Sequence, residues 1–258
     1  MSAAPALASL ARDFAADLTR TVRAVVGPDC PAFIADTPEL PQPSGSSAVV
    51  VRQSPAEGIV LRSGVDPLLT LTVEFRCAWD GHGSYLAVTW SRIAVFPRED
   101  VGREPLVRYE YDKAMRSGLP AAHVQVHGTH KALAEVMADA GAGTQRGRRR
   151  RASTASGRLP ALSQLHFPVG GHRFRPCLED LLAVLIDEFG IDVPGGDRQA
   201  ALDALADGRE DWRRSQVGAA VRDAPDVAVR VLRELGYTIG WEQSGPEPAG
   251  QPERLRAL

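Results

Sequence analysis

The chain lacks several features that would restrict its function. Its 258 residues contain only three cysteines, Cys30, Cys77 and Cys177, which lie far apart and form no CxxC motif. A disulfide scaffold and a cysteine-based zinc site are therefore not expected, and a reducing cytoplasm is the expected compartment. No apolar run approaches the roughly 18 to 20 residues of a membrane-spanning helix, so we expect no membrane partner.

Lysine is also scarce. Only two of the 30 basic residues, Lys113 and Lys131, are lysine, and the others are arginine. This bias, together with abundant alanine, is typical of a GC-rich genome, so arginine content alone does not indicate phosphate recognition. The N-terminus has no basic segment before an apolar stretch, which predicts that there is no secretory signal. Glycine motifs for nucleotide binding and hydrolysis are absent, and the sequence implies no cofactor and no metal.

Hydrophobic periodicity divides the chain into segments. Apolar residues with helical spacing predict an amphipathic helix within residues 1–27. Five prolines and a Ser-Gly-Ser-Ser run predict a linker over residues 28–47. From residue 48 onward the period changes to two, most clearly from Leu69 to Cys77, which predicts strands. A shift of apolar parity in the next strand predicts a bulge near Ser91.

The remaining segments complete a fold of the α+β class. Residues 48–190 are predicted to form an antiparallel sheet with a helix, and within them residues 140–158, which have no apolar pattern, predict a mobile loop. Helices are expected in residues 191–243, and the Pro- and Gly-rich residues 244–258 are expected to be disordered. The predicted architecture is a central antiparallel β-meander covered on one face by the N-terminal helix and the C-terminal helices.

A net charge of −2 hides a strong local asymmetry. Between Ala140 and Leu178 the chain has eight arginines and neither an acidic residue nor a lysine. An arginine-rich flexible loop attracts polyanions through counterion release. The alternatives are a solvated loop without a partner and an acidic protein partner. The sequence therefore predicts contact with RNA or DNA through seven arginines: Arg146, Arg148, Arg149, Arg150, Arg151, Arg173 and Arg175.

Two of these arginines belong to a Pro- and Gly-rich stretch, residues 168–176, that leads into the best predicted helix. Gly170 and Gly171 would let the backbone approach a phosphate closely, and the following helix N-terminus favours anions. The preferred interpretation is a rigid connector that packs Phe167 and Phe174 into the core.

The histidines indicate where catalysis could occur. His123 and His127 alternate with valines, which predicts a strand, and Gln125 lies between them on the same face. The preceding strand alternates its polar side chains with apolar ones. If the two strands pair with their apolar faces together, the polar face combines carboxylates, a cation and groups that titrate near neutrality. The alternative is an ordinary solvent-facing sheet surface. The polar residues of the preceding strand are Arg108, Glu110 and Asp112.

This cluster predicts a metal-independent ribonuclease. His123 and His127 would act as base and acid, Glu110 would orient one of them, and Arg108 would stabilise the transition state. Residues four apart on a strand are separated by about 13 Å, at about 3.3 Å per residue, which is too far for two ligands of one zinc ion. A metal site or small-molecule site that includes His166 is a further alternative.

The chain resembles the TumE-type toxins of bacterial toxin–antitoxin pairs over at most about residues 105–188. Three segments carry the resemblance: Leu106-Val-Arg-Tyr-Glu-Tyr-Asp112, Pro120-Ala-Ala-His123 and Val126-His127. It implies a toxin-like role that acts on RNA, with functional positions at Tyr109, Asp112, His123 and His127.

Two hypotheses of function follow. In the first, the protein engages nucleic acid, as a binder or as a ribonuclease. In the second, it is a non-enzymatic interaction module whose sheet is a scaffold and whose C-terminal helices dock a protein partner. The sequence names no oligomeric state and does not decide whether the protein is an enzyme.

Overall fold

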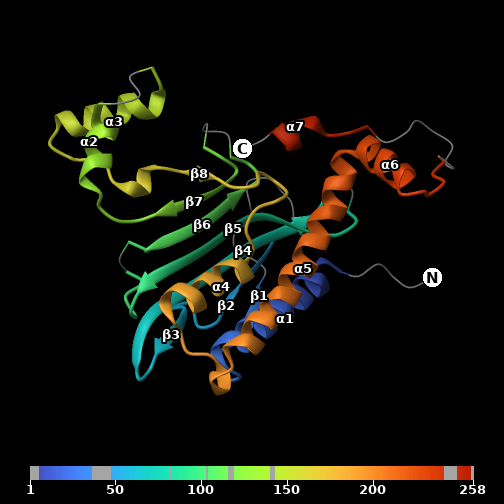
Figure 1. The fold of residues 1–258 in the computed structure, drawn as a ribbon, viewed down its shortest axis with the longest axis horizontal. Coiled ribbons are helices and arrows are strands. Elements are labelled where there is room, and N and C mark those ends of the chain that lie inside the picture. The colour runs from blue at the N-terminus through green and yellow to red at the C-terminus, as the bar shows by residue number, and fades with distance from the viewer. Residues whose placement is uncertain are drawn as a thin grey trace.

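The computed structural model describes residues 6–36, 48–81, 83–102, 104–115, 119–139, 143–240 and 249–256. Within these residues the fold is α+β and contains one antiparallel sheet, which confirms the predicted class (Figure 1). The strands are β1 (Phe33–Asp36), β2 (Val49–Gln53), β3 (Ile59–Ser63), β4 (Asp66–Trp79), β5 (Leu86–Pro97), β6 (Val107–Asp112), β7 (Ala122–Val126) and β8 (Phe167–Pro168). The helices are α1 (Leu7–Val26), α2 (Lys131–Asp139), α3 (Gln145–Ala155), α4 (Leu178–Phe189), α5 (Arg198–Asp223), α6 (Pro225–Glu234), α7 (Pro252–Arg256) and two short 3-10 turns, η1 (Leu162–Gln164) and η2 (Pro194–Gly196).

The strands lie in the order β1-β2-β4-β5-β6-β7-β8, and β3 pairs with the part of β4 that β2 leaves open. Every pairing is antiparallel. From β4 to β7 each strand lies beside its predecessor in the chain. This half of the sheet is the predicted meander.

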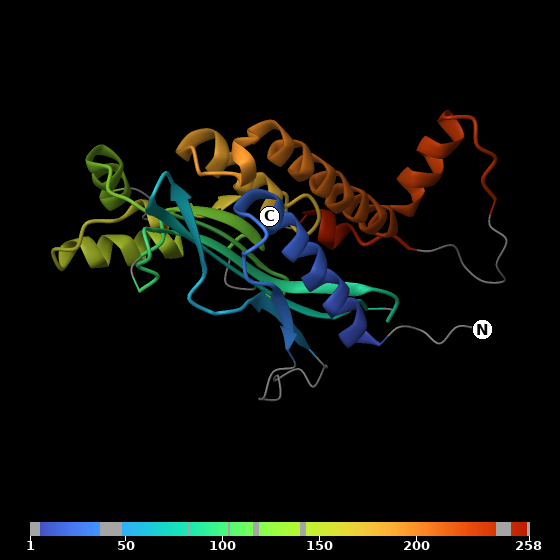
Figure 2. The ribbon, with the colours of Figure 1, turned by 90° about the horizontal axis from the view of Figure 1, so that it is seen from below.

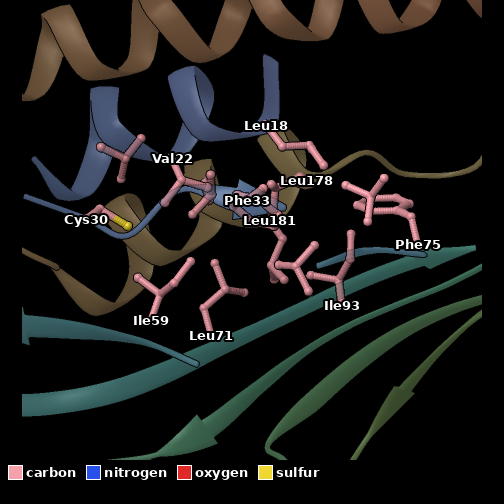
Figure 3. Packing of buried hydrophobic residues seen from close by; sticks show 14 of the residues in the cluster. Leu18, Val22, Cys30, Phe33, Ile59, Leu71, Phe75, Ile93, Leu178 and Leu181 are labelled. Carbon is pink, nitrogen blue, oxygen red and sulfur yellow. The ribbon is translucent and has the colours of Figure 1, made fainter. Parts of the chain in front are cut away.

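The hydrophobic core lies between one face of the sheet and helices α1, α4 and α5. Figures 1 and 2 show these helices on the same side of the sheet. Alternate residues of β4, such as Leu71 and Val73, point toward them and are almost fully buried. Figure 3 shows Leu71 and Ile93 of the sheet facing Val22 of α1 and Leu181 of α4. Each such side chain stabilises the fold by about 1.5–3 kcal/mol through burial.

A bulge in β5 keeps its apolar side chains on the core face. Arg76 of β4 pairs with Trp90, but the next residue, Cys77, pairs with Val88, so Thr89 is an extra residue in β5. This irregularity lies two positions from Ser91 and confirms the predicted bulge. It explains the change of apolar parity along this strand.

The predicted linker contains a strand. Phe33 of β1 is buried in the core, and its backbone nitrogen donates a hydrogen bond of 2.8 Å to Thr19 Oγ1 on α1. Strand β1 then pairs with β2 at the edge of the sheet. The sequence pattern did not reveal this strand, because it has only four residues and lies in a proline-rich segment. Residues 37–47 of the predicted linker are outside the described residues.

The predicted mobile loop contains helix α3 (Gln145–Ala155). The Thr144 side chain caps this helix by accepting a hydrogen bond of 3.0 Å from Gly147 N. Arginine and alanine both have high helix propensity, so no apolar stripe is needed to explain the helix. The prediction was wrong because it required hydrophobic periodicity. Residues 140–142 are outside the described residues.

The C-terminal region is helical as predicted, but the expectation of a disordered tail is wrong where the tail is described. Helix α7 lies in it, and Gln251 N donates a hydrogen bond of 2.7 Å to Asp223 O at the end of α5. Residues 244–248 and 257–258 are outside the described residues. Figures 1 and 2 show α6 projecting from the body. It exposes an apolar stripe: Val227, Val231, Leu232 and Leu235.

Candidate functional site

The pairing of β6 with β7 places four of the six predicted polar side chains on one face of the sheet: Arg108, Glu110, His123 and Gln125. Arg108 lies opposite Gln125, and Glu110 lies opposite His123. Tyr109 lies between them in sequence and therefore on the other face, where it packs against the hydrophobic core. The shared polar face is as predicted, but Tyr109, a position implied by the resemblance, is not on it.

Glu110 is the centre of this polar cluster. Its Oε2 atom lies 3.2 Å from Arg108 Nε and 3.3 Å from His123 Nε2, and its Oε1 atom lies 3.9 Å from Arg92 Nε on β5. Burial raises the pKa of Glu110, but the hydrogen bond with His123 and the charges of Arg108 and Arg92 lower it by more, so the net pKa is below its ordinary value. An ionised Glu110 therefore holds these three side chains together.

Gln125 joins the cluster to the segment that precedes β8. Its Oε1 atom accepts a hydrogen bond of 3.0 Å from Arg108 Nε. Its amide nitrogen donates to Ser163 O at 2.8 Å and lies 2.9 Å from His166 Nε2. Because Gln125 is almost fully buried, these contacts fix the segment against β7.

His166 lies over the cluster and takes part in its hydrogen bonding. Its Nδ1 atom donates to Gln164 O at 3.2 Å, and its ring centre lies 4.8 Å from that of His123. Burial lowers the pKa of His166, and the charges of His123 and Arg146 lower it further. The neutral ring with its proton on Nδ1 satisfies both contacts, since Nε2 then accepts from Gln125.

His123 has no open side toward a substrate. It is only 2% exposed, its Nδ1 donates to Pro120 O at 3.1 Å, and its Nε2 faces Glu110. The alternative of a solvent-facing polar surface is therefore wrong at this position. Both ring nitrogens hold the turn before β7 to the sheet, which is a structural role.

His127 and Asp112 lie outside the cluster. His127 follows β7, and its Nδ1 lies 2.7 Å from Glu104 Oε1. It is separated from His123 by about 13 Å of extended chain, at about 3.3 Å per residue. Asp112 Oδ1 accepts a hydrogen bond of 2.8 Å from Ala114 N in the turn after β6. The structure does not bring the two predicted catalytic histidines to one point.

Arg92 was missed by the sequence analysis. Its partner Glu110 is fixed by the register of β5 with β6, in which Arg92 lies directly opposite Glu110. The signal was present in the bulge of β5, because the parity after the bulge puts Arg92 on the polar face. To place Arg92 beside Glu110, the register of β5 with β6 must also be known.

Helix α3 borders a pocket of about 360 Å³ beside His166. Three arginines of α3 face it from positions three and four residues apart, which share one side of a helix. Arg150 Nε is buried and has no hydrogen-bond partner among the described residues. No carboxylate lies among the described residues that form this wall: Leu119, Gln145, Arg146, Arg149, Arg150, Ser153, Ser163, Gln164 and His166.

The other arginines of α3 face solvent. Arg148 and Arg151 are exposed, as is Arg149 at the edge of the pocket. Figures 1 and 2 show α2 and α3 side by side at one end of the molecule, at the opposite end from α6. The five arginines of the predicted nucleic-acid-binding loop therefore lie on one short helix, partly exposed and partly facing the pocket.

The two remaining predicted nucleic-acid contacts lie elsewhere. Arg173 forms two hydrogen bonds, of 2.5 and 3.0 Å, with the carboxylate of Asp223, which is 1% exposed. The Arg175 guanidinium lies 4.0 Å from the ring centre of Tyr111 and 5.1 Å from that of Trp212. Both arginines line the space between the sheet and α5 rather than the pocket of α3. Both arginines therefore have partners within the fold, and their contact with phosphate stays a prediction.

Gly170 serves a turn of the chain. Its φ is +65°, and Phe174 N donates a hydrogen bond of 2.9 Å to Gly170 O. A Cβ at Gly170 would lie 2.0 Å from Phe174 O, which no side chain allows. Residues Phe167 and Phe174 are 48% and 65% exposed, so the expectation that they pack into the core is wrong.

Comparisons with known proteins give no relative. No protein-family model matches the chain, and neither do curated proteins or solved structures. The resemblance to TumE-type toxins therefore stays a prediction. In the part of the chain that the structure describes, no three histidine, cysteine or acidic side chains are grouped to hold a metal ion. No helix there has the length and apolar character needed to cross a bilayer.

Proposed function

We propose that this protein binds nucleic acid through the arginines of α3, without sequence preference. The observation that carries the proposal is the composition and conformation of this helix. It has five arginines and no carboxylate, so α3 offers no ion pair between its own residues. A helix with this charge density attracts a phosphate backbone and releases counterions from it.

Binding is favoured over cleavage because of the state of the histidines. His123 and His166 each have both ring nitrogens engaged, and His127 lies away from them. A general base needs a nitrogen within hydrogen-bond reach of the proton that it abstracts. We therefore expect bound RNA to stay intact.

The interaction-module hypothesis has one structural feature in its favour, the exposed apolar stripe of α6 (Val227, Val231, Leu232 and Leu235). Such a stripe suits a protein contact but indicates no particular partner. The charge of α3, in contrast, specifies the chemistry of its ligand. We therefore advance nucleic-acid binding as the function.

The test is a titration of the purified protein against fluorescent single-stranded RNA at several salt concentrations in the presence of EDTA. Five arginine contacts predict a slope of log K against log salt of about −3.5, at about −0.7 per phosphate on single strands. The Arg148→Gln/Arg151→Gln double variant should reduce this slope by about 1.4.

The matched control is the Arg213→Gln/Arg214→Gln double variant, which removes two exposed arginines from α5. Its slope should equal that of the wild type. Equal slopes for both double variants, or no binding by the wild type, would contradict the proposal. RNA cleavage that is lost in His123→Ala would restore the ribonuclease hypothesis.

A further inference from the structure

The pocket beside α3 differs from the exposed side of the same helix in what it can bind. Arg146 and Arg150 are half-buried and lie one helical turn apart, whereas Arg148 and Arg151 are exposed. An internal phosphodiester of a bound strand carries one negative charge and can be held by exposed arginines. A half-buried set of guanidinium groups suits a smaller and more highly charged group.

We propose that this pocket holds the terminal phosphomonoester of a bound nucleic-acid strand, an inference that rests on the proposed function. A phosphomonoester carries a charge of about −1.5 to −2 near pH 7 and has three strong acceptor oxygens. The pocket wall offers the matching donors in the guanidinium groups of three arginines, and no carboxylate among the described residues there opposes them.

Arg150 supplies the most specific part of this argument. Its Nε is buried without a hydrogen-bond partner among the described residues. A buried donor without an acceptor is costly, and arginine in particular is suited to two parallel hydrogen bonds with phosphate oxygens. Arg150 lines the pocket, so a phosphate bound there would lie beside this side chain.

The uncharged groups of the wall fit the same ligand. Ser153 and Ser163 carry hydroxyl groups, and Gln145 and Gln164 carry amide groups that can donate to phosphate oxygens. His166 also lines the pocket. Its pKa is lowered, chiefly because of burial, so its neutral form is favoured and the arginines supply the positive charge. The volume of about 360 Å³ accommodates a phosphate and part of a nucleoside.

The experiment compares single-stranded RNAs that differ only at one end. One pair has a 5′-phosphate or a 5′-hydroxyl group with the fluorophore at the 3′ end, and a second pair has a 3′-phosphate or a 3′-hydroxyl group with the fluorophore at the 5′ end. We expect the wild type to bind the RNA with one of the two phosphorylated ends at least about ten times more tightly than its hydroxyl counterpart. Charged hydrogen bonds have an effect of this size.

Arg150→Gln should abolish this preference while it retains binding of the hydroxyl RNA, and Arg150→Lys should restore only part of it. The matched control is Arg151→Gln, which removes the neighbouring exposed charge and should weaken both RNAs equally. Circular dichroism and thermal unfolding establish that each variant is folded, and Arg146→Gln provides a second test of the pocket.

The outcomes separate the two proposals. Equal affinity of the wild type for all four RNAs would overturn the terminal-phosphate site and leave nucleic-acid binding intact. Absence of binding to every RNA would overturn both proposals. If adenosine monophosphate binds as tightly as the phosphorylated strand, the pocket serves free nucleotides and the strand-end proposal is overturned.

Discussion

Arg173 offers a prediction that distinguishes a structural arginine from a nucleic-acid contact. Its Nε lies 2.5 Å from Asp223 Oδ2, and the Asp223 side chain is 1% exposed while that of Arg173 is 14% exposed. The hydrogen bond to Asp223 raises the pKa of Arg173. The pair joins the loop before α4 to the end of α5. Arg173→Gln removes one partner and leaves the other charge buried.

The expected loss of unfolding free energy in Arg173→Gln depends on the burial of Asp223 and on the second arginine near it, Arg254. Removing one partner of a buried ion pair costs about 3–5 kcal/mol of the free energy of unfolding. Arg254 remains 3.7 Å from the same carboxylate and compensates for part of the loss. We therefore expect a loss of about 3 kcal/mol, near the lower end of the range for buried pairs. For a chain of this length that corresponds to a fall in Tm of about 6–12 °C.

The assay combines thermal and urea unfolding with the RNA titration. Arg214→Gln is the control, because its ion pair with Glu210 has side chains that are 76% and 60% exposed, and its loss should cost about 0.5 kcal/mol or less. Arg173→Gln should keep the salt slope of RNA binding unchanged. A Tm within about 1 °C of the wild type, together with a slope reduced by about 0.7, would refute this reasoning and make Arg173 a phosphate contact.

Two more predictions concern stability. Gly170→Ala should lose about 2 kcal/mol or more in urea unfolding, because its Cβ would overlap Phe174 O, whereas Gly64→Ala, with a similar φ and open space around it, should lose less. Burial lowers the pKa of His166 and of His172, so the unfolded chain binds protons more readily there and stability should fall as pH drops below about 6.5. In the His166→Gln/His172→Gln variant the loss between about pH 7 and pH 5.5 should be smaller. If the variant and the wild type lost the same stability over this pH range, His166 and His172 would not be the cause of the pH dependence.

The sheet was predictable from sequence because its signals are local. Alternation along β4 and β6 follows from which side chains face the core, and the parity change in β5 follows from one bulge. The shared face of Glu110 and His123 needed only the assumption that apolar faces pair together. Burial of that face was not predictable, because it depends on Ser163 and His166, which arrive about 40 residues later in the chain.

Helix α3 was missed for a different reason. Its sequence has no apolar stripe, so periodicity indicated a loop, although arginine and alanine favour a helix and Thr144 provides a cap. The prediction of a strong positive charge was independent of this error, since charge does not depend on conformation. The helical conformation places Arg146 and Arg150 on a half-buried side, whereas Arg148 and Arg151 are exposed.

A single arginine is a weaker signal of a polyanionic ligand than a run of arginines. Arg173 lies outside the arginine run of α3, with only Arg175 as an arginine close to it in the chain, and one aspartate, 50 positions away, is enough to satisfy it. No local pattern reveals such a distant partner. The five arginines of α3 lie in one short helix that contains no carboxylate of its own. Charge density along the chain, rather than the number of arginines, is therefore the property on which the proposal of nucleic-acid binding rests.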